Sequence, residues 1–207
     1  MRIKHLFLAA GAILALCAGC VDPDYKIDDL EFSGVIFRNM EVPIGNFEEV
    51  TLNTILEAPG SEVITLRPGV YSLEGSADLE GFSLKFSSDL YFKKAELHTV
   101  ILNTLPLDLS FRIEALDGEG QPCPDVTVTV IADRTPAIAS GKKGQPSSNP
   151  VVLRLECPGY YAPLETLRLH FTGQTGQGFE NEAPRTDEGI TLTQVVLKMP
   201  DGFQVNL

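Results

Sequence analysis

Residues 107–115 read L-D-L-S-F-R-I-E-A, and apolar side chains alternate with polar ones throughout this stretch. A period of two is typical of a β-strand with one buried face and one face in water. The turn-forming run D-G-E-G follows at 117–120, and valines then alternate with threonines in 126–131. The pattern predicts a β-hairpin of 107–115 and 126–131 at the centre of an antiparallel sheet.

Short alternating runs, separated by glycine and proline, recur along the rest of the chain. Residues 63–66 and 70–73 flank a Pro-Gly turn at 68–69 and predict a second hairpin. The alternation in 190–199 slips by one position, which a β-bulge near Gln194 would explain. Short strands without a helical repeat indicate an all-β, antiparallel β-sandwich, Ig-like or similar. The other predicted strands are 35–37, 82–86, 151–157, 167–171 and 203–207, together with 90–92 and 97–102, which form one strand or two.

One short helix is predicted in the first half of the chain. Asn46 and Glu49 have the spacing of a capping box, and the apolar residues of 52–56 would then share one face. A strand through 50–56 is the alternative, and the capping pattern slightly favours the helix.

Two long polar loops are expected, at 135–150 and 173–189, together with a short turn at 158–163. If each connection reverses the chain direction, both long loops project from one end of the sandwich. The short turn, with Tyr160 and Tyr161, then lies at the other end. Because clustered end loops often form binding surfaces, the end with the long loops is a candidate binding surface.

The charge of the chain excludes one class of partner. The 207 residues carry a formal net charge of −12. Nucleic-acid binding requires clusters of Lys and Arg that release counterions from the phosphates, so we expect no nucleic-acid partner. We expect the acidic surface to favour solubility.

The first twenty residues predict where the protein resides. Two basic residues precede an apolar run at 6–16, which has the length of a signal peptide and is shorter than the roughly 20 residues of a transmembrane helix. The following C-A-G-C at 17–20 resembles a bacterial lipobox. We therefore expect a lipoprotein signal peptide at 1–19 and acyl chains, palmitate among them, on Cys20. Cleavage before Cys17 and an ordinary secretory signal are the alternatives. Several acyl chains, at about 0.8 kcal/mol per buried CH₂, anchor a protein stably to a membrane.

An acidic segment follows, V-D-P-D-Y-K-I-D-D-L at 21–30, and is expected to be an extended tether. Residues 24–29 match a D-Y-x-[LI]-x-D stretch. With the lipobox, this stretch resembles the small, mostly uncharacterised surface lipoproteins of the Bacteroidota type. The resemblance implies an all-β body displayed on the outer face of the outer membrane, and it implies no catalytic residue.

The domain organisation follows from these segments. The signal peptide at 1–19 and the tether at 20–32 precede an N-terminal β region at 33–104 and a C-terminal β-sandwich at 105–207. As an alternative, the last two segments together form one domain.

Cys123 and Cys157 are the cysteines of the body. A compartment beyond the inner membrane permits disulfides. The two cysteines would lie side by side if their strands are antiparallel neighbours, and a bond would contribute roughly 3–4 kcal/mol in the chain-entropy model. Two separate buried thiols are the alternative.

The remaining candidate residues give weaker signals. His98 and His170 lack the partner pattern of a zinc site or a catalytic triad, so we expect surface histidines, no metal and no cofactor. Tyr160 and Tyr161 are weak candidates for stacking on a sugar ring, and packing over the sandwich end is the simpler interpretation.

These expectations favour a non-enzymatic, lipid-anchored protein of the outer membrane that faces the cell surface and binds a glycan or another envelope protein. The alternative is a structural or assembly subunit of a surface fibre, with 203–207 as its exchangeable strand. A hydrolase is less favoured, because the sequence shows no identifiable nucleophile–base pair or carboxylate pair.

Overall fold

The computed structural model describes only part of the chain. The predicted signal peptide, the tether, Cys20 and the predicted strand at 82–86 lie outside the described residues. The structure describes residues 35–37, 39–79, 90–161 and 166–205, with the backbone alone at 35–37, 90–92, 157–161 and 203–205.

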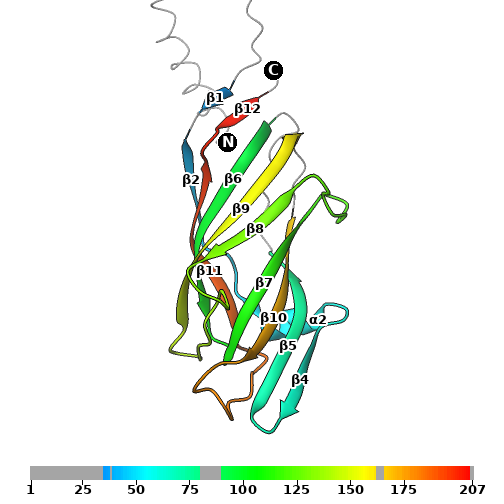
Figure 1. Cartoon of the computed structure of the whole chain (residues 1–207), viewed down its shortest axis with the longest axis vertical. Helices are drawn as coiled ribbons and strands as arrows, with labels where there is room; N and C mark the ends of the chain where they lie inside the picture. The colour runs from blue at the N-terminus through cyan, green and yellow to red at the C-terminus, as the bar shows by residue number, and fades with distance from the viewer. Residues whose placement is uncertain (1–34, 38, 80–89, 162–165, 206–207) are drawn as a thin grey trace, which may run out of the picture. The chain divides into compact units, whose positions relative to one another are not determined.

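Two antiparallel sheets pack face to face around one apolar core, which confirms the predicted all-β sandwich (Figure 1). The strands of the smaller sheet, in spatial order, are β4 (Glu62–Arg67), β5 (Val70–Asp78), β10 (Thr166–Thr175) and β7 (Leu107–Leu116).

The larger sheet has eight strands, and the long β6 (Leu90–Asn103) lies at its centre. On one edge of β6 lie β9 (Ser147–Tyr161) and then β8 (Thr127–Ala132). The other edge pairs with β11 (Gly189–Met199) and with β12 (Phe203–Val205). The short strands β2 (Met40–Gly45) and β3 (Val50–Thr51) pair with β11, and β1 (Val35–Phe37) pairs with β12.

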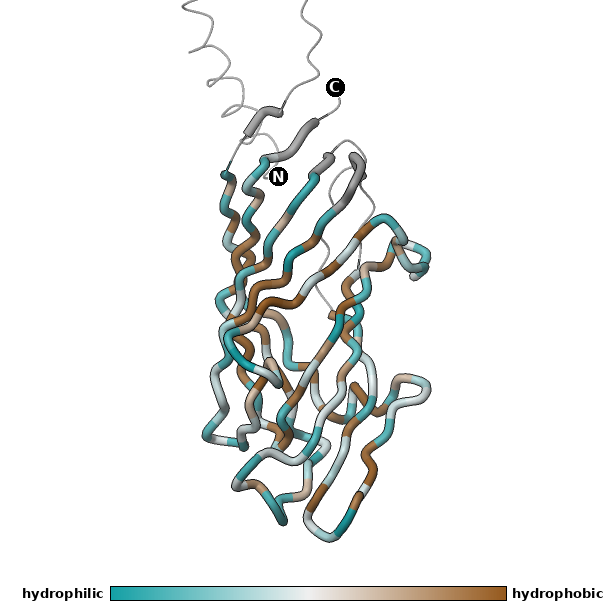
Figure 2. Tube along the Cα trace, in the orientation of Figure 1, coloured by the Kyte–Doolittle hydropathy of each residue, from teal (hydrophilic) through white to brown (hydrophobic). Residues whose placement is uncertain are grey.

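The core lies between the sheets because the apolar face of each alternating strand points inward. Leu107, Leu153 and Leu169 come from three different strands and are completely buried. Burying each leucine contributes about 1.5–3 kcal/mol. The hydropathy of the trace shows the same alternation of apolar and polar positions along the strands (Figure 2).

The predicted central hairpin of 107–115 with 126–131 is wrong, although both strands form. β7 pairs with β10 along its length, whereas β8 pairs with β9 in the other sheet. The backbone N–H of Cys123 still donates to the end of β7, as at the start of a hairpin. Pro122 and Pro124 have no N–H to donate, so the ladder stops and the chain crosses to the larger sheet.

Strands from both sides of the expected boundary near Thr104 share both sheets. β5 pairs with β10 in the smaller sheet, and β6 pairs with β9 and β11 in the larger one. Gly34–Leu207 accordingly form one unit.

The short helix in the first half is confirmed, but its predicted start is wrong. Helix α2 (Leu52–Glu57) begins after Thr51, whose side chain accepts a hydrogen bond from the N–H of Thr54. Asn46 instead accepts a hydrogen bond from the N–H of Gln194. The helix packs closely on β5, since a Cβ at Gly75 would lie 2.6 Å from the Ile55 side chain.

The predicted bulge near Gln194 is confirmed. The register of β11 against β6 shifts between Thr193 and Val196, and Gln194 has φ of 54°. The predicted hairpin around 68–69 is also confirmed, as β4 and β5.

Some predicted loops are shorter than expected. β9 begins at Ser147 and β10 continues to Thr175, so strands take up part of both predicted long loops. The predicted turn at 158–163 is wrong for 158–161, which continue β9 with an irregular register against β6. The sequence pattern did not predict β2, because Pro43 interrupts it. No helix among the described residues is long and apolar enough to cross a membrane.

Candidate functional site

The outer face of the four-stranded sheet carries a regular grid of polar side chains. Each of these positions alternates with a core residue along β5, β10 and β7, so strand pairing places all of them on one face. The register aligns them into four rows: Asp78–Arg168–Glu114, Ser76–His170–Arg112, Glu74–Thr172–Ser110 and Ser72–Gln174–Asp108.

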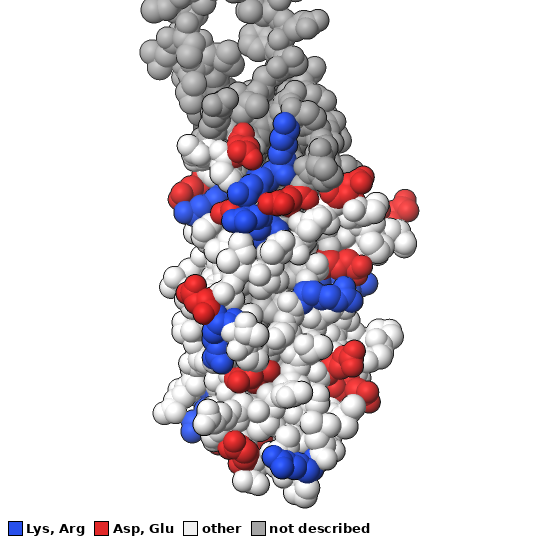
Figure 3. All heavy atoms as spheres, viewed as in Figure 1, with Lys and Arg blue, Asp and Glu red and all other residues white. Residues whose placement is uncertain are grey.

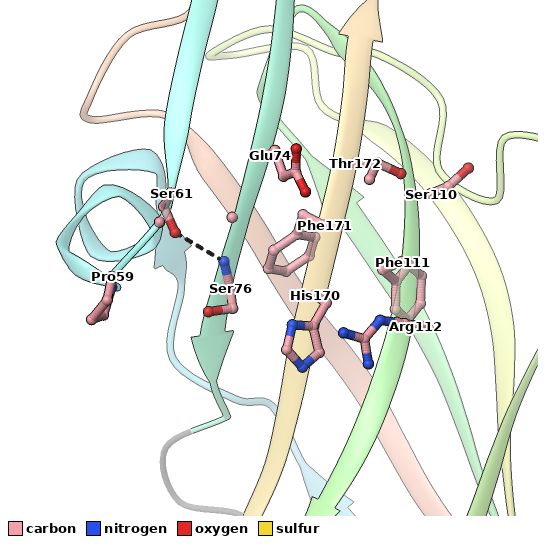
Figure 4. Close-up of a pocket in the computed structure, with 12 residues that line it drawn as sticks. Pro59, Ser61, Glu74, Ser76, Ser110, Phe111, Arg112, His170, Phe171 and Thr172 are labelled. Carbon is pink, nitrogen blue, oxygen red and sulfur yellow. Dashed lines mark hydrogen bonds between the residues drawn. The ribbon is translucent and has the colours of Figure 1, made fainter.

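A groove runs over this grid, and we call it the outer groove. It consists of two adjoining hollows of about 470 Å³ and 600 Å³ that share Glu74, Ser110 and Thr172. The first hollow continues to His170 and Arg112, which lie side by side in Figure 4. The second hollow continues to Gln174 and Pro136.

Ion pairs hold one end of the grid in place. Arg168 donates two hydrogen bonds to Asp78, at 2.7 Å and 3.0 Å. These bonds raise the pKa of Arg168 above its usual value. His170 Nε2 lies 3.2 Å from Glu114 Oε2, so this carboxylate orients the imidazole ring. The contacts of Arg168 with Asp78 and of His170 with Glu114 therefore hold the side chains around Arg112 in place before a ligand binds.

Two charged residues of the groove have no ion-pair partner among the described residues. Arg112 and Glu74 are both exposed, and they lie on β7 and β5 in neighbouring rows of the grid. Glu62 stands directly opposite Glu74 on β4. Because like charges in opposite positions repel, this pair of carboxylates favours a partner that brings a positive charge or hydrogen-bond donors.

One wall of the groove is set by the loop between α2 and β4. Ser61 Oγ accepts a hydrogen bond from the N–H of Ser76 at 3.2 Å, as the dashed line in Figure 4 marks. This bond takes the place of a ladder contact just before β4 begins at Glu62. Pro59, Gly60 and Ser61 therefore close the groove beside β5.

The two long loops lie at the same end of the sandwich, as expected. Lys143 of the first loop donates to Asp187 of the second at 2.8 Å. The hydrogen bond from Lys143 and the nearby charge of Arg185 lower the pKa of Asp187 below its usual value. Both loops are fixed by backbone hydrogen bonds to the β6–β7 corner, since Gly141 N donates to Leu105 O and Gly176 N donates to Pro106 O. The loop end is thus an ordered surface, and it adjoins the outer groove at Pro136.

A row of alternating charges crosses the outer face of the larger sheet. Register aligns Glu41, Lys198, Glu96 and Arg154 across four strands. Arg154 donates to Glu96 at 3.0 Å, and Lys198 lies 3.0 Å from Glu41. Basic and acidic side chains gather in this band in Figure 3. Because the charges compensate one another, the row supports cross-strand pairing and leaves little net charge for a ligand.

The cysteine and tyrosine candidates are only partly described. Cys123 is buried in the connection that leads into β8, and β8 is the antiparallel neighbour of β9, which contains Cys157. The side chains of Cys157, Tyr160 and Tyr161 lie outside the described residues. The disulfide and the stacking role of the tyrosines therefore stay predictions.

Both histidines lie on outer sheet faces beside glutamates. His98 Nε2 is 3.2 Å from Glu96, and His170 has the Glu114 contact described above. No group of three or more His, Cys, Asp or Glu side chains suitable for a metal ion occurs in the described part of the chain.

Ser76, His170 and Glu114 have the residue types of a hydrolytic triad and lie on three adjacent strands. Within the described residues, however, no hydrogen bond joins Ser76 to His170. The N–H groups of such strands are used in the ladders, so the grid offers no obvious backbone donors for an oxyanion. Ser76 and His170 both line the outer groove, where their side chains offer hydrogen-bonding groups to a ligand.

The outer groove could not be predicted from the sequence. His170 was expected at the surface, and it lies on the outward face of β10. Arg112 and Glu74 were not candidates, because the polar faces of β5, β7 and β10 become one surface only through their register.

No protein-family model matches the chain, and neither the curated proteins nor the solved structures contain a match.

Proposed function

We propose that this protein is a non-enzymatic binding module of a bacterial cell surface, anchored by a lipid on Cys20, whose outer groove holds the ligand. The observation that carries the proposal is the pair of exposed charges at Arg112 and Glu74. Both lie without an ion-pair partner, among the described residues, in a groove lined by hydroxyl and amide side chains. Unpaired charges on rigid strands cost little to reorganise when a ligand binds.

The chemistry of the groove favours an acidic oligosaccharide as the ligand. Arg112 would bind a sugar carboxylate through two parallel N–H donors. Glu74 would accept hydrogen bonds from sugar hydroxyls, and Ser110 and Thr172 would donate to or accept from ring substituents. An extended segment of another envelope protein is the competing ligand, since it could supply the same groups.

A binding experiment with matched variants tests this proposal. The full chain in detergent is applied to an array of neutral and acidic glycans and is compared with Arg112→Ala and Lys142→Ala. Both variants remove one exposed positive charge, but Lys142 does not line the groove. We expect binding to acidic glycans that weakens at least tenfold in Arg112→Ala and is unchanged in Lys142→Ala. Equal binding by both variants, or no binding to any glycan, would count against the proposal.

The location is tested separately from the ligand. Mass spectrometry of the protein purified from membranes should show a mature chain that begins at Cys20 and carries acyl groups. Cys20→Ser should abolish both the lipid mass and the membrane association. A mature chain that begins elsewhere, without an acyl mass, would contradict the anchor.

A fibre subunit is the second candidate function, and the short β12 favours it. β12 contacts β6 through two register pairs, Gln204↔Tyr91 and Val205↔Leu90, so a strand from another molecule could replace it at low cost. Polymers of the purified protein that disappear when 203–207 are deleted would support this function. A protein that stays free of polymers over a wide range of concentration would contradict it.

A further inference from the structure

Most strand edges of the sandwich are protected along their length, whereas the irregularity of β4 is confined to its end, where the register against β5 shifts between Thr65 and Arg67. β7 and β8 lie at the ends of their sheets but contact each other where the two sheets meet. β2 contains Pro43, which cannot donate a backbone hydrogen bond, and it ends at Gly45 with φ of 107°. Natural proteins use such devices to prevent strand addition at sheet edges.

The edge strand β4 has the composition of a strand that pairs. It reads E-V-I-T-L-R, a run of residues with high β propensity, and its only non-exposed residue is Val63. Ile64 is 44% exposed and Leu66 is 57% exposed, the highest values among the large apolar side chains of the described residues. An exposed apolar edge strand of this kind is a site for strand addition.

The charges at the ends of β4 point to the identity of the added strand. Glu62 begins the strand and faces Glu74, while Arg67 ends it. Neither Glu62 nor Arg67 has an ion-pair partner in the part of the chain that the structure describes. A second β4 that runs antiparallel brings its positive end to the negative end of the first. Parallel pairing would bring like charges together.

We propose that two copies of this protein associate through β4, in an antiparallel pair with its twofold axis at Thr65. In this register Ile64 of each copy lies opposite Leu66 of the other, and Thr65 lies opposite itself. At each end Arg67 of one copy lies opposite Val63 of the other, one position along the strand from Glu62. The long arginine side chain extends from the irregular end of β4, where the register shifts between Thr65 and Arg67, and can reach this carboxylate. Such a self-complementary pair has the twofold symmetry that is most frequent in homo-oligomers.

The association joins the two small sheets into one continuous sheet. A twofold axis perpendicular to a sheet keeps the same face outward in both copies, so both outer grooves lie on one side of the dimer. A single strand pair buries less than the roughly 1,200 Å² of a standard stable interface. The dimer is therefore weak in dilute solution, and it forms at high protein concentration.

A charge-exchange experiment tests the pairing. Sedimentation velocity of the full chain in detergent, over a range of concentration, is compared for Glu62→Arg, Arg67→Glu and the double variant. We expect each single variant to weaken the dimer at least tenfold and the double variant to restore it. The control Glu119→Arg makes the same change in the exposed turn after β7 and should leave the dimer unchanged. A monomer at every concentration, or a double variant no better than the singles, overturns the proposal.

Cysteine crosslinking provides a second measurement that does not depend on the charge changes. Thr65→Cys places two thiols opposite each other at the twofold axis, so mild oxidation should give a covalent dimer. Thr129→Cys makes the same change at an exposed position of β8, the edge strand that contacts β7. We expect a crosslink for Thr65→Cys at least tenfold faster than for Thr129→Cys. Equal rates would overturn the proposal even if a dimer forms, because the dimer would then use another surface. Circular dichroism confirms the fold of each variant.

Discussion

Replacing Asn103 with alanine removes a side chain that joins three segments of backbone inside the sandwich. Asn103 is completely buried at the end of β6. Its Nδ2 donates to Leu107 O at 3.0 Å and to Ala139 O at 2.7 Å. Its Oδ1 accepts from the N–H of Leu105 at 2.9 Å. The side chain thus ties the β6–β7 corner to the loop after β8.

The expected loss of stability follows from these three bonds. A hydrogen bond in a protein contributes about 1 kcal/mol net, and a buried group left without a partner costs about 1–3 kcal/mol. We expect Asn103→Ala to lower the free energy of unfolding by about 3 kcal/mol. In a domain of this size each kcal/mol lowers the melting temperature by about 2–4 °C, so the expected decrease is roughly 6–12 °C.

Two further variants make the measurement specific. Asn103→Asp keeps the volume but turns an acceptor toward two carbonyl oxygens, so it should destabilise more than alanine at pH 7. Asn53→Ala removes an exposed asparagine whose Nδ2 donates only to Glu57, and it should change stability by less than about 0.5 kcal/mol. The free energies come from urea unfolding followed by circular dichroism. A loss below about 1 kcal/mol for Asn103→Ala, or an aspartate variant as stable as the native protein, would refute the reasoning.

Three other changes have expected outcomes. Burial acts to raise the pKa of Glu96, but hydrogen bonds from His98, Arg154 and Lys94 bring it below the usual 4.5. The contacts of the ionised Glu96 therefore stabilise the folded protein above that pH, and this contribution is lost as the pH falls. The native protein should be more stable than Glu96→Gln at pH 7, and the difference in their free energies of unfolding should decrease between pH 7 and pH 3 in urea unfolding. Leu153→Ala creates a cavity at a completely buried position and should cost about 2–5 kcal/mol by the same assay. Gln194→Gly should be neutral or stabilise by up to about 1 kcal/mol in thermal unfolding, because its φ of 54° suits glycine, and a clear destabilisation would contradict this.

The local patterns of the sequence predict the strands well because alternation and turn chemistry act over a few residues. The bulge in β11 could be predicted because one extra residue shifts the phase of the pattern around Gln194. The β4–β5 hairpin could be predicted because its Pro-Gly turn directly joins two strands. β2 was missed since Pro43 is unfavourable inside a strand, and only an edge position tolerates it.

The partners of the strands could not be predicted from the same patterns. An alternating strand fits any neighbour that buries its apolar face, so the pattern of β7 is equally compatible with β8 and with β10. The prolines at 122 and 124 carried the decisive signal against the β7–β8 hairpin. The outer groove depends on those pairings. Each residue of the groove could be assigned to the solvent-exposed face of its own strand. Only the register of the strands places Arg112 and Glu74 in neighbouring rows of one surface.

The interleaving of early and late strands has a consequence for how the chain reaches its native state. β5 and β6 are synthesised early, yet they pair with β10 and β11, which are synthesised near the end. Such non-local pairing gives a high contact order and therefore slow folding. Until β10 emerges, β5 has only β4 as a partner in its sheet, so the apolar face of this hairpin stays exposed in a ribosome-bound chain. A nascent chain of this topology needs protection from aggregation, and a chain truncated before residue 166 cannot assemble the smaller sheet.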